Sequence, residues 1–212
     1  MKHILTSLLL LLSFNLFSQT DLGIGIVSIN FDSNTEMNFY QNTSDKNPVK
    51  TLQFFDDSEI NSWNICDLEH QKVWLQPESL WLDYHSFNFR VVEKNAEWYK
   101  VIVNNETGKT LWLENSEIAD FHSWEEYLKN MFSISRLPQA DQKILKSPIS
   151  GSSQIPYNGP DCFQVKNMKG DWIEIFSPEH CGGFTDSKPE IKSGWIRWRI
   201  GNKLLIEYFI TS

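Results

Sequence analysis

The 212-residue chain carries 27 acidic and 19 basic side chains and has a formal net charge of −8 at pH 7. This acidic balance argues against nucleic acid as a partner, because phosphate backbones are bound by clustered Lys and Arg. Apolar residues make up 41% of the chain, and aromatic residues are plentiful, so the composition excludes a mainly disordered protein.

The first 18 residues have the pattern of a secretory signal peptide. Lys2 and His3 precede an apolar run from Ile4 to Leu12, which is followed by Ser13 to Ser18. A membrane anchor, the alternative, needs about 20 apolar residues, and this run is shorter. We therefore expect residues 1–18 to be removed, leaving a chain exported to the periplasm, the cell surface or the medium, without stable membrane insertion.

Alternating and aromatic runs predict strands over most of the following hundred or so residues. Short strands are expected at 23–29, 37–40 and 49–55, and a longer series of strands between Val73 and Leu113. Between them, the segment from Asp56 to Glu69 mixes polar and aromatic residues. We expect this segment to form a long loop that carries Cys66.

One helix is predicted after this region. Ser123 and Glu126 have the spacing of a capping box, and Trp124, Leu128 and Met131 follow at helical intervals. Pro138 limits how far the helix can run. The sequence predicts a helical connector over residues 122–141.

The rest of the chain again reads as strands. Apolar alternation predicts strands at 143–145, 162–166, 171–176 and 195–199, with a turn-rich loop over 148–159. Ile200-Gly201-Asn202 separates two strand patterns near the end, which indicates a β-hairpin.

Two segments repeat the same cassette, a Trp-containing strand followed by a second Trp strand. The first comprises residues 97–103 and 108–113, and the second comprises 171–176 and 193–198. Internal repetition of this kind predicts two small β modules in tandem.

The motifs within these modules resemble those of the bacterial Src-homology-3-like domain. In the second module the matching segments are 144–148, 162–165, 170–175 and 194–196, and in the first they are 37–40, 48–49, 98–101 and 112–113. The chain departs from the family pattern in inserts at about 56–82 and 178–192, and in Leu111, which stands where a Gly usually precedes the Trp.

The resemblance implies a mostly β fold of two small Src-homology-3-like β-barrel modules. The first would span 19–121 with its insert, and the second 142–212 with a C-terminal β-hairpin. Members of the family are typically non-catalytic and bind peptides or cell-wall glycans.

Three cysteines remain after the expected signal cleavage. Cys162 and Cys181 share the second module, so we expect them to form a disulfide in an oxidising compartment, with Cys66 either buried and inert or free. A metal site seeded by His180 and Cys181 is the alternative, but no metal-ligand spacing supports it.

The candidate binding surface is aromatic and basic. Trp195, Arg197 and Arg199 share one parity and would line one strand face, where they could receive a carboxylate or an acidic partner. Ion pairing of the arginines with the module's own acids, such as Glu174 or Glu207, is the alternative. Further aromatic candidates for ligand contact are Tyr157, Trp172 and Trp98, which could instead fill the core.

Evidence for catalysis is weak. Cys66 with His70 or His85 is a conceivable dyad, but neither pair lies in a nucleophile motif, and Asp56, Asp57 and Glu59 are typical loop acids. We therefore expect a binding protein without cofactor that recognises a peptide, a protein or a cell-envelope glycan. The alternatives are an inhibitor or immunity-type protein that blocks a secreted enzyme, and a hydrolase that uses Cys66.

Overall fold

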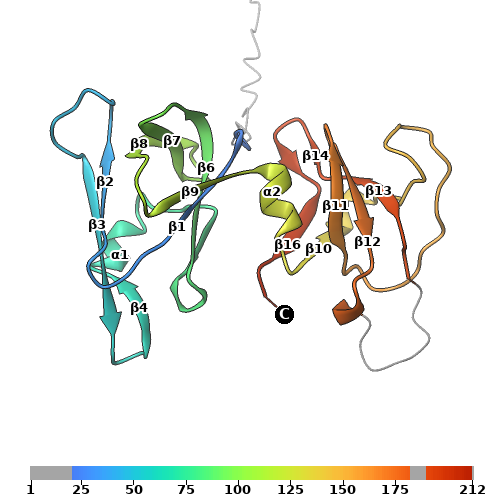
Figure 1. Ribbon diagram of the computed structural model, residues 1–212, viewed down its shortest axis with the longest axis horizontal. Coiled ribbons are helices and arrows are strands. Elements are labelled where there is room, and N and C mark those ends of the chain that lie inside the picture. Colours follow the sequence, from blue (N-terminus) through green and yellow to red (C-terminus); the bar gives the residue numbers. More distant parts are fainter. Residues whose placement is uncertain (1–20, 182–189, 212) are drawn as a thin grey trace, which may run out of the picture.

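The computed structural model describes residues 21–181 and 190–211 and is mostly β, with its strands gathered in two halves (Figure 1). The expected signal peptide lies outside the described residues, as does the middle of the insert expected at 178–192. Within the described residues, no helix is long and apolar enough to cross a membrane.

The first half is a curled, half-barrel sheet in which all pairs are antiparallel. Its strand order is β4-β3-β2-β8-β7-β6-β1-β9, and β5 pairs with β6. The strands are β1 (Gly25–Ile29), β2 (Glu36–Tyr40), β3 (Lys50–Asp57), β4 (Ser62–Ile65), β5 (Ser79–Trp81), β6 (Ser86–Lys94), β7 (Trp98–Asn104), β8 (Lys109–Glu114) and β9 (Ala119–Ser123). Two short helices, α1 (Leu68–Gln71) and η1 (Leu82–Tyr84), interrupt the strand series.

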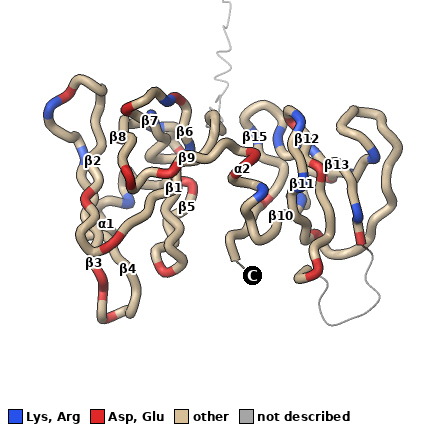
Figure 2. Tube along the Cα trace, viewed as in Figure 1, with Lys and Arg blue, Asp and Glu red and all other residues tan. Residues whose placement is uncertain are grey.

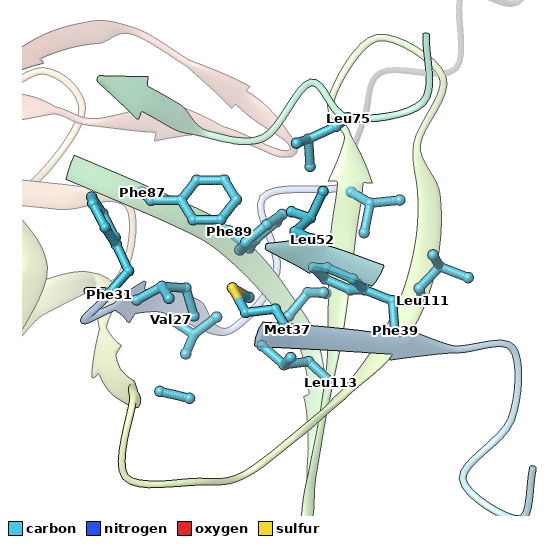
Figure 3. Close-up of a cluster of buried hydrophobic side chains, with 14 of the residues drawn as sticks. Val27, Phe31, Met37, Phe39, Leu52, Leu75, Phe87, Phe89, Leu111 and Leu113 are labelled. Atoms are coloured by element: carbon cyan, nitrogen blue, oxygen red, sulfur yellow. The ribbon is translucent and has the colours of Figure 1, made fainter. Parts of the chain in front are cut away.

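Apolar side chains on the inner face of this sheet form its core (Figure 3). Because successive strand residues point to opposite faces, alternate positions such as Met37 and Phe39 in β2 enter the core together. The rings of Phe87 and Phe89 lie 4.8 Å apart, and Phe89 meets Phe39 edge-on at 5.6 Å. The strand predicted at 37–40 is therefore confirmed, with its alternate residues in the core.

The prediction of a long loop over residues 56–69 is wrong. Strand β3 continues to Asp57 and pairs with β4, with Phe54 opposite Ile65 and Asp57 opposite Ser62. Helix α1 follows at Leu68. A polar segment can form this hairpin because backbone hydrogen bonds, rather than apolar side chains, define the ladder.

Helix α2 (Trp124–Lys129) lies between the two halves in Figure 1. Its capping box is confirmed, because Ser123 Oγ accepts from the Glu126 amide and Glu126 accepts from the Ser123 amide. The helix is much shorter than the expected connector over 122–141. The chain instead enters β10 (Ser133–Arg136) and the 3₁₀ turn η2 (Pro138–Ala140).

The second half is built from short antiparallel pairings. The strands β11 (Gln164–Lys169), β12 (Trp172–Phe176) and β13 (Gly194–Arg197) form one three-stranded sheet, and η3 (Glu179–Cys181) follows β12. The predicted hairpin is confirmed as β14 (Arg199–Ile200) and β15 (Lys203–Leu204) around Gly201, whose φ is +57°. The last strand, β16 (Ile206–Phe209), then pairs with β10.

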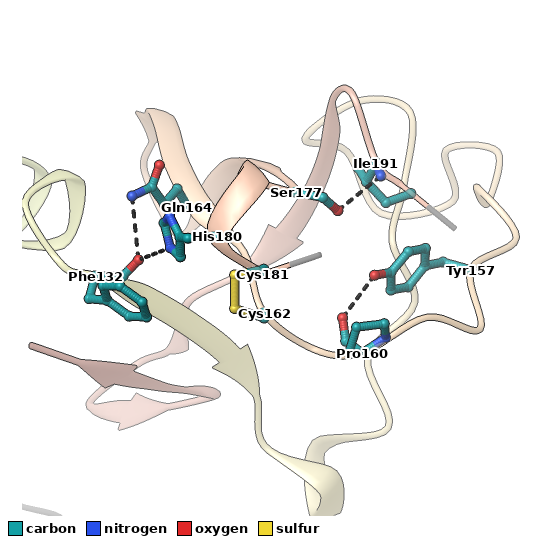
Figure 4. Close-up of a disulfide and its surroundings, with 9 residues drawn as sticks. All are labelled: Phe132, Tyr157, Pro160, Cys162, Gln164, Ser177, His180, Cys181 and Ile191. Carbon is teal, nitrogen blue, oxygen red and sulfur yellow. Dashed lines mark hydrogen bonds between the residues drawn. A yellow bond between two sulfur atoms is a disulfide. The ribbon is translucent and has the colours of Figure 1, made fainter. Parts of the chain in front are cut away.

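A disulfide joins Cys162 to Cys181, as predicted, and ties the start of β11 to η3 (Figure 4). Beside it, His180 Nε2 lies 3.0 Å from the carbonyl oxygen of Phe132, which also accepts from Gln164. Cys66 is free and exposed. Because Cys181 is oxidised, it has no thiolate to serve as a ligand in the alternative metal site that His180 and Cys181 would have seeded.

Strand β1 contributes to both halves. Ile26 and Val27 are both fully buried, but Val27 belongs to the core of the first sheet, whereas Ile26 packs with Trp124, Trp198 and other residues of the second core. The Trp124 indole N–H also donates to the carbonyl oxygen of Leu22, at 3.0 Å. The two halves therefore share buried surface along β1.

We predict that replacing the disulfide by Cys162→Ser/Cys181→Ser will lower the free energy of unfolding by about 3 kcal/mol, since the bridge closes a loop between residues 19 positions apart. Urea unfolding of the oxidised wild type and the variant measures this difference. Cys66→Ser is the matched control and should leave stability nearly unchanged. An equal loss in both variants would contradict the prediction.

We predict that Ile26→Ala will cost about 2–5 kcal/mol, because it opens a cavity in the core that β1 shares with the second half. Hydrogen exchange of the β11–β13 amides should then accelerate together with that of β1. Ile24→Ala, at an exposed neighbouring position, should change stability by less than about 0.5 kcal/mol. Unchanged protection of β11–β13 in Ile26→Ala would argue against coupling of the halves.

Candidate functional site

The basic strip predicted on the second half, Trp195, Arg197 and Arg199, runs from β13 into β14 and lies beside β12. Arg197 is opposite Trp172, and its guanidinium lies 4.6 Å from the centre of the indole ring. Arg199 Nε donates to Asp171 Oδ1 at 2.8 Å, and Arg197 Nη1 is 3.9 Å from Asp171 Oδ2. Both arginines are therefore already matched by a carboxylate of the same half.

The acid that pairs with the arginines differs from the two that were expected. Glu174 accepts hydrogen bonds from Ser193 Oγ and Asn167 Nδ2, which lower the pKa of Glu174 below its ordinary value. Glu207 lies on β16, where it is opposite Ser135. Asp171 takes their place because the turn between β11 and β12 holds it beside both arginines.

The neighbouring tryptophans have different environments. Trp195 is half-buried and lies opposite Glu174, whereas Trp198 is 2% exposed and packs against Trp124 at 5.4 Å between ring centres. Trp195 is therefore partly accessible to a ligand, whereas Trp198 belongs to the core of the second half.

The remaining aromatic candidates lie elsewhere. Tyr157 packs on Phe163 at 5.5 Å and donates its hydroxyl to the carbonyl oxygen of Pro160, so it serves the loop that contains it. Trp98 is in the first half, edge-on to Tyr40 at 5.3 Å. The structure therefore brings Trp172, Trp195, Arg197 and Arg199 together and separates Tyr157 and Trp98 from them.

The two histidines considered for the dyad with Cys66 are engaged with other partners. His70 Nδ1 is 2.5 Å from Asp67 Oδ1, and this carboxylate raises the pKa of His70. His85 Nε2 accepts from the indole N–H of Trp63 at 3.0 Å. Within the described part of the chain, no hydrogen bond joins either histidine to Cys66, and no group of three or more His, Cys, Asp or Glu is placed to hold a metal ion.

A buried ion pair lies where the two halves meet. The side chains of Glu78 and Arg90 are 7% and 13% exposed, and the Arg90 guanidinium donates to the Glu78 carboxylate. The same carboxylate accepts from Tyr208 of β16 and from Asn105. Burial and the charge of Glu78 raise the pKa of Tyr208 well above its ordinary value, so this hydroxyl stays a donor at physiological pH.

An open hollow with an aromatic lining lies on the first half, over the insert. We call it the aromatic groove; it has a volume of about 610 Å³. Trp81 and Tyr84 on its rim are 56% and 54% exposed, and their ring centres lie 6.1 Å apart. Its other apolar lining residues are Ile60, Trp63, Leu68, Leu80 and Leu82.

A second hollow, the acidic hollow, adjoins the aromatic groove and shares Ser62, Trp63 and Asp83 with it. It measures about 230 Å³ and is also lined by Asp56 and His85. The hydrogen bond from Trp63 to His85 holds the indole between the two hollows. His85 in turn stacks on Phe31, with ring centres 5.3 Å apart, so this wall is anchored to the core of the first sheet.

Sequence reasoning missed the groove because it did not predict the turn η1 that follows Trp81, and because it assigned the region before Leu68 to a loop. In the structure the chain leaves β5 at Trp81 and turns through η1, which buries Leu82 and leaves Trp81 and Tyr84 exposed. The available signal was the pair of aromatic residues spaced three apart around one leucine. That spacing fits a helical turn better than an alternating strand.

Comparison with protein-family models, with curated proteins and with solved structures found no significant match to this chain.

Proposed function

We propose that this chain is an exported, non-catalytic binding protein of the Src-homology-3-like type, and that the aromatic groove is its ligand-contact surface. The disulfide between Cys162 and Cys181 is compatible with export, because such bonds persist mainly in oxidising compartments. The two-module, Src-homology-3-like description rests on the motif resemblance and on the separation of the strands into two halves.

The observation that carries the proposal is the exposure of Trp81 and Tyr84 in a groove whose lining is mainly apolar and aromatic. A soluble protein gains nothing for its own stability by leaving two large aromatic rings in water. Clustered exposed aromatic side chains are typical of surfaces that recognise extended peptides or sugars.

The basic strip on β13 and β14 is a weaker candidate. Its arginines are matched by Asp171, and Arg197 covers the ring of Trp172. A ligand would have to displace these contacts before it could form its own, and this cost reduces the net affinity of such a site. We therefore assign the main contact surface to the first half.

An inhibitor or immunity-type protein is the second candidate. The acids that line the hollow beside the groove favour it, because they could contact a basic surface of a secreted enzyme. Such an inhibitor would use the same surface, so the first experiment serves both candidates.

We predict that Trp81→Ala/Tyr84→Ala will lose at least about 30-fold in affinity for ligands of this protein, as expected when an aromatic hot spot worth about 2 kcal/mol is truncated. Ligands would be selected with the wild type from a displayed library of random peptides and from an array of envelope glycans. Affinities would then be measured by calorimetry for both proteins.

Trp195→Ala serves as the matched control, because it removes an aromatic residue of the second half. Both substituted positions in the test variant are exposed, so its thermal unfolding should resemble that of the wild type. If selected ligands bind the groove variant as tightly as the wild type, or if only Trp195→Ala weakens them, the assignment to the groove is wrong.

A further inference from the structure

We infer that the occupant of the groove is a basic protein or peptide segment, with a Lys or Arg side chain entering the acidic hollow and a neighbouring apolar side chain lying in the aromatic groove. The inference rests on the proposed function and narrows it to one class of ligand.

The charge of the insert is the first support. Residues 56–85 contain seven acidic side chains and one basic side chain, Lys72, so this segment carries −6 of the formal net charge of −8. Figure 2 shows acidic residues along β3 and at the turn into β4, at the end of the molecule where the groove lies. A concentration of one sign of charge attracts a ligand of the opposite sign.

The second support is that four of these acids have no cationic partner in the described residues, and that two of the four, Asp56 and Asp83, line the acidic hollow. Lys72 pairs with Glu69 at 2.5 Å, Asp67 with His70, and Glu78 with Arg90. In the described residues, no ion pair or hydrogen bond involves the carboxylates of Asp56 or Asp83. Both are exposed, and both line the acidic hollow.

The third support is the arrangement of apolar and acidic walls. The Trp63 indole belongs to both hollows, so a side chain passing from one to the other contacts its ring. Lys and Arg fit this path, because an apolar stem carries a cation at its end and a cation near an indole gains a further attraction. The charged end would then reach Asp56 and Asp83.

Other ligand chemistries fit less well. An acidic segment would be repelled by the net charge of residues 56–85. A neutral sugar could stack on the ring of Trp81 and donate hydrogen bonds from its hydroxyl groups to Asp83. It would, however, leave the carboxylates of Asp56 and Asp83 without a counter-charge. A basic segment satisfies the aromatic and the acidic walls at the same time.

The test uses four probes with the whole mature chain. Three are capped peptides of equal length in which a central phenylalanine is flanked by two lysines, two serines or two glutamates, and the fourth is a chito-oligosaccharide. Binding is followed by the NMR shifts of the Trp63 and Trp81 indole N–H groups. We expect the lysine peptide to bind at least about tenfold more tightly than the serine peptide and the glutamate peptide to bind weakest.

Asp56→Asn/Asp83→Asn should reduce the preference for lysine over serine by about tenfold and leave the affinity for the serine peptide nearly unchanged. Asp141→Asn/Glu207→Gln makes the same change in net charge on exposed residues of the second half and is the matched control. The preference should also shrink as the salt concentration rises from about 0.1 M to about 1 M, where the Debye length falls from about 10 Å to about 3 Å.

The outcomes separate this inference from the function it rests on. The lysine and serine peptides could bind equally tightly, or the oligosaccharide could bind more tightly than either. If Trp81→Ala abolishes that binding, the inference of a basic ligand is wrong but the groove remains a binding site. If Asp56→Asn/Asp83→Asn and the control Asp141→Asn/Glu207→Gln reduce the preference for lysine equally, the preference arises from the overall charge of the protein. That result would also overturn the inference. Binding of any probe that Trp81→Ala leaves unchanged would count against the groove itself.

Discussion

The rest of the structure depends on the burial of β1 on both of its faces. Strand alternation sends the side chains of Ile26 and Val27 in opposite directions, and both are removed from water, in different cores. A strand in a sheet that is covered on one face only would expose one of them. Burial of a side chain of this size contributes about 1.5–3 kcal/mol, so separating the halves would be costly at this strand alone. The pairing of β9 with β1 also brings the start of α2 to the second core, where Trp124 reaches the carbonyl oxygen of Leu22.

Contacts between the two halves also hold the segments that line the aromatic groove in place. Glu78 is held by Arg90 of β6 and by Tyr208 of the last strand, and Trp81 follows three residues later. A buried carboxylate with this many donors resists displacement, because breaking one contact would leave a charge uncompensated in a poorly hydrated place. The segment that carries Trp81 is thus anchored from both halves at its start, while Trp63 is anchored through His85 and Phe31 at the other side of the groove.

Predictions that rest on short-range chemistry agree with the structure. The capping box at Ser123, the hairpin around Gly201 and the alternation within β2 each depend on residues a few positions apart. The Cys162–Cys181 disulfide was predictable because only these two cysteines share the second half. Predictions failed where partners are distant. The acid that neutralises Arg197 and Arg199 could not be chosen from the sequence, since Asp171, Glu174 and Glu207 all have suitable chemistry and only the position of the β11–β12 turn distinguishes them.

The sequence by itself determined that the chain is mostly β, acidic, interrupted by a helix capped at Ser123 and crosslinked in its second half, because these properties follow from composition, alternation and local spacing. Only the tertiary structure decided that β1 belongs to two cores, that the expected loop after Asp56 pairs as a hairpin, and that Trp63, Trp81 and Tyr84 line one groove beside Asp56 and Asp83. Some of these features bring together residues that are more than a hundred positions apart in the chain, such as Ile26 and Trp198. Long-range packing, rather than any local preference, selects which of them meet.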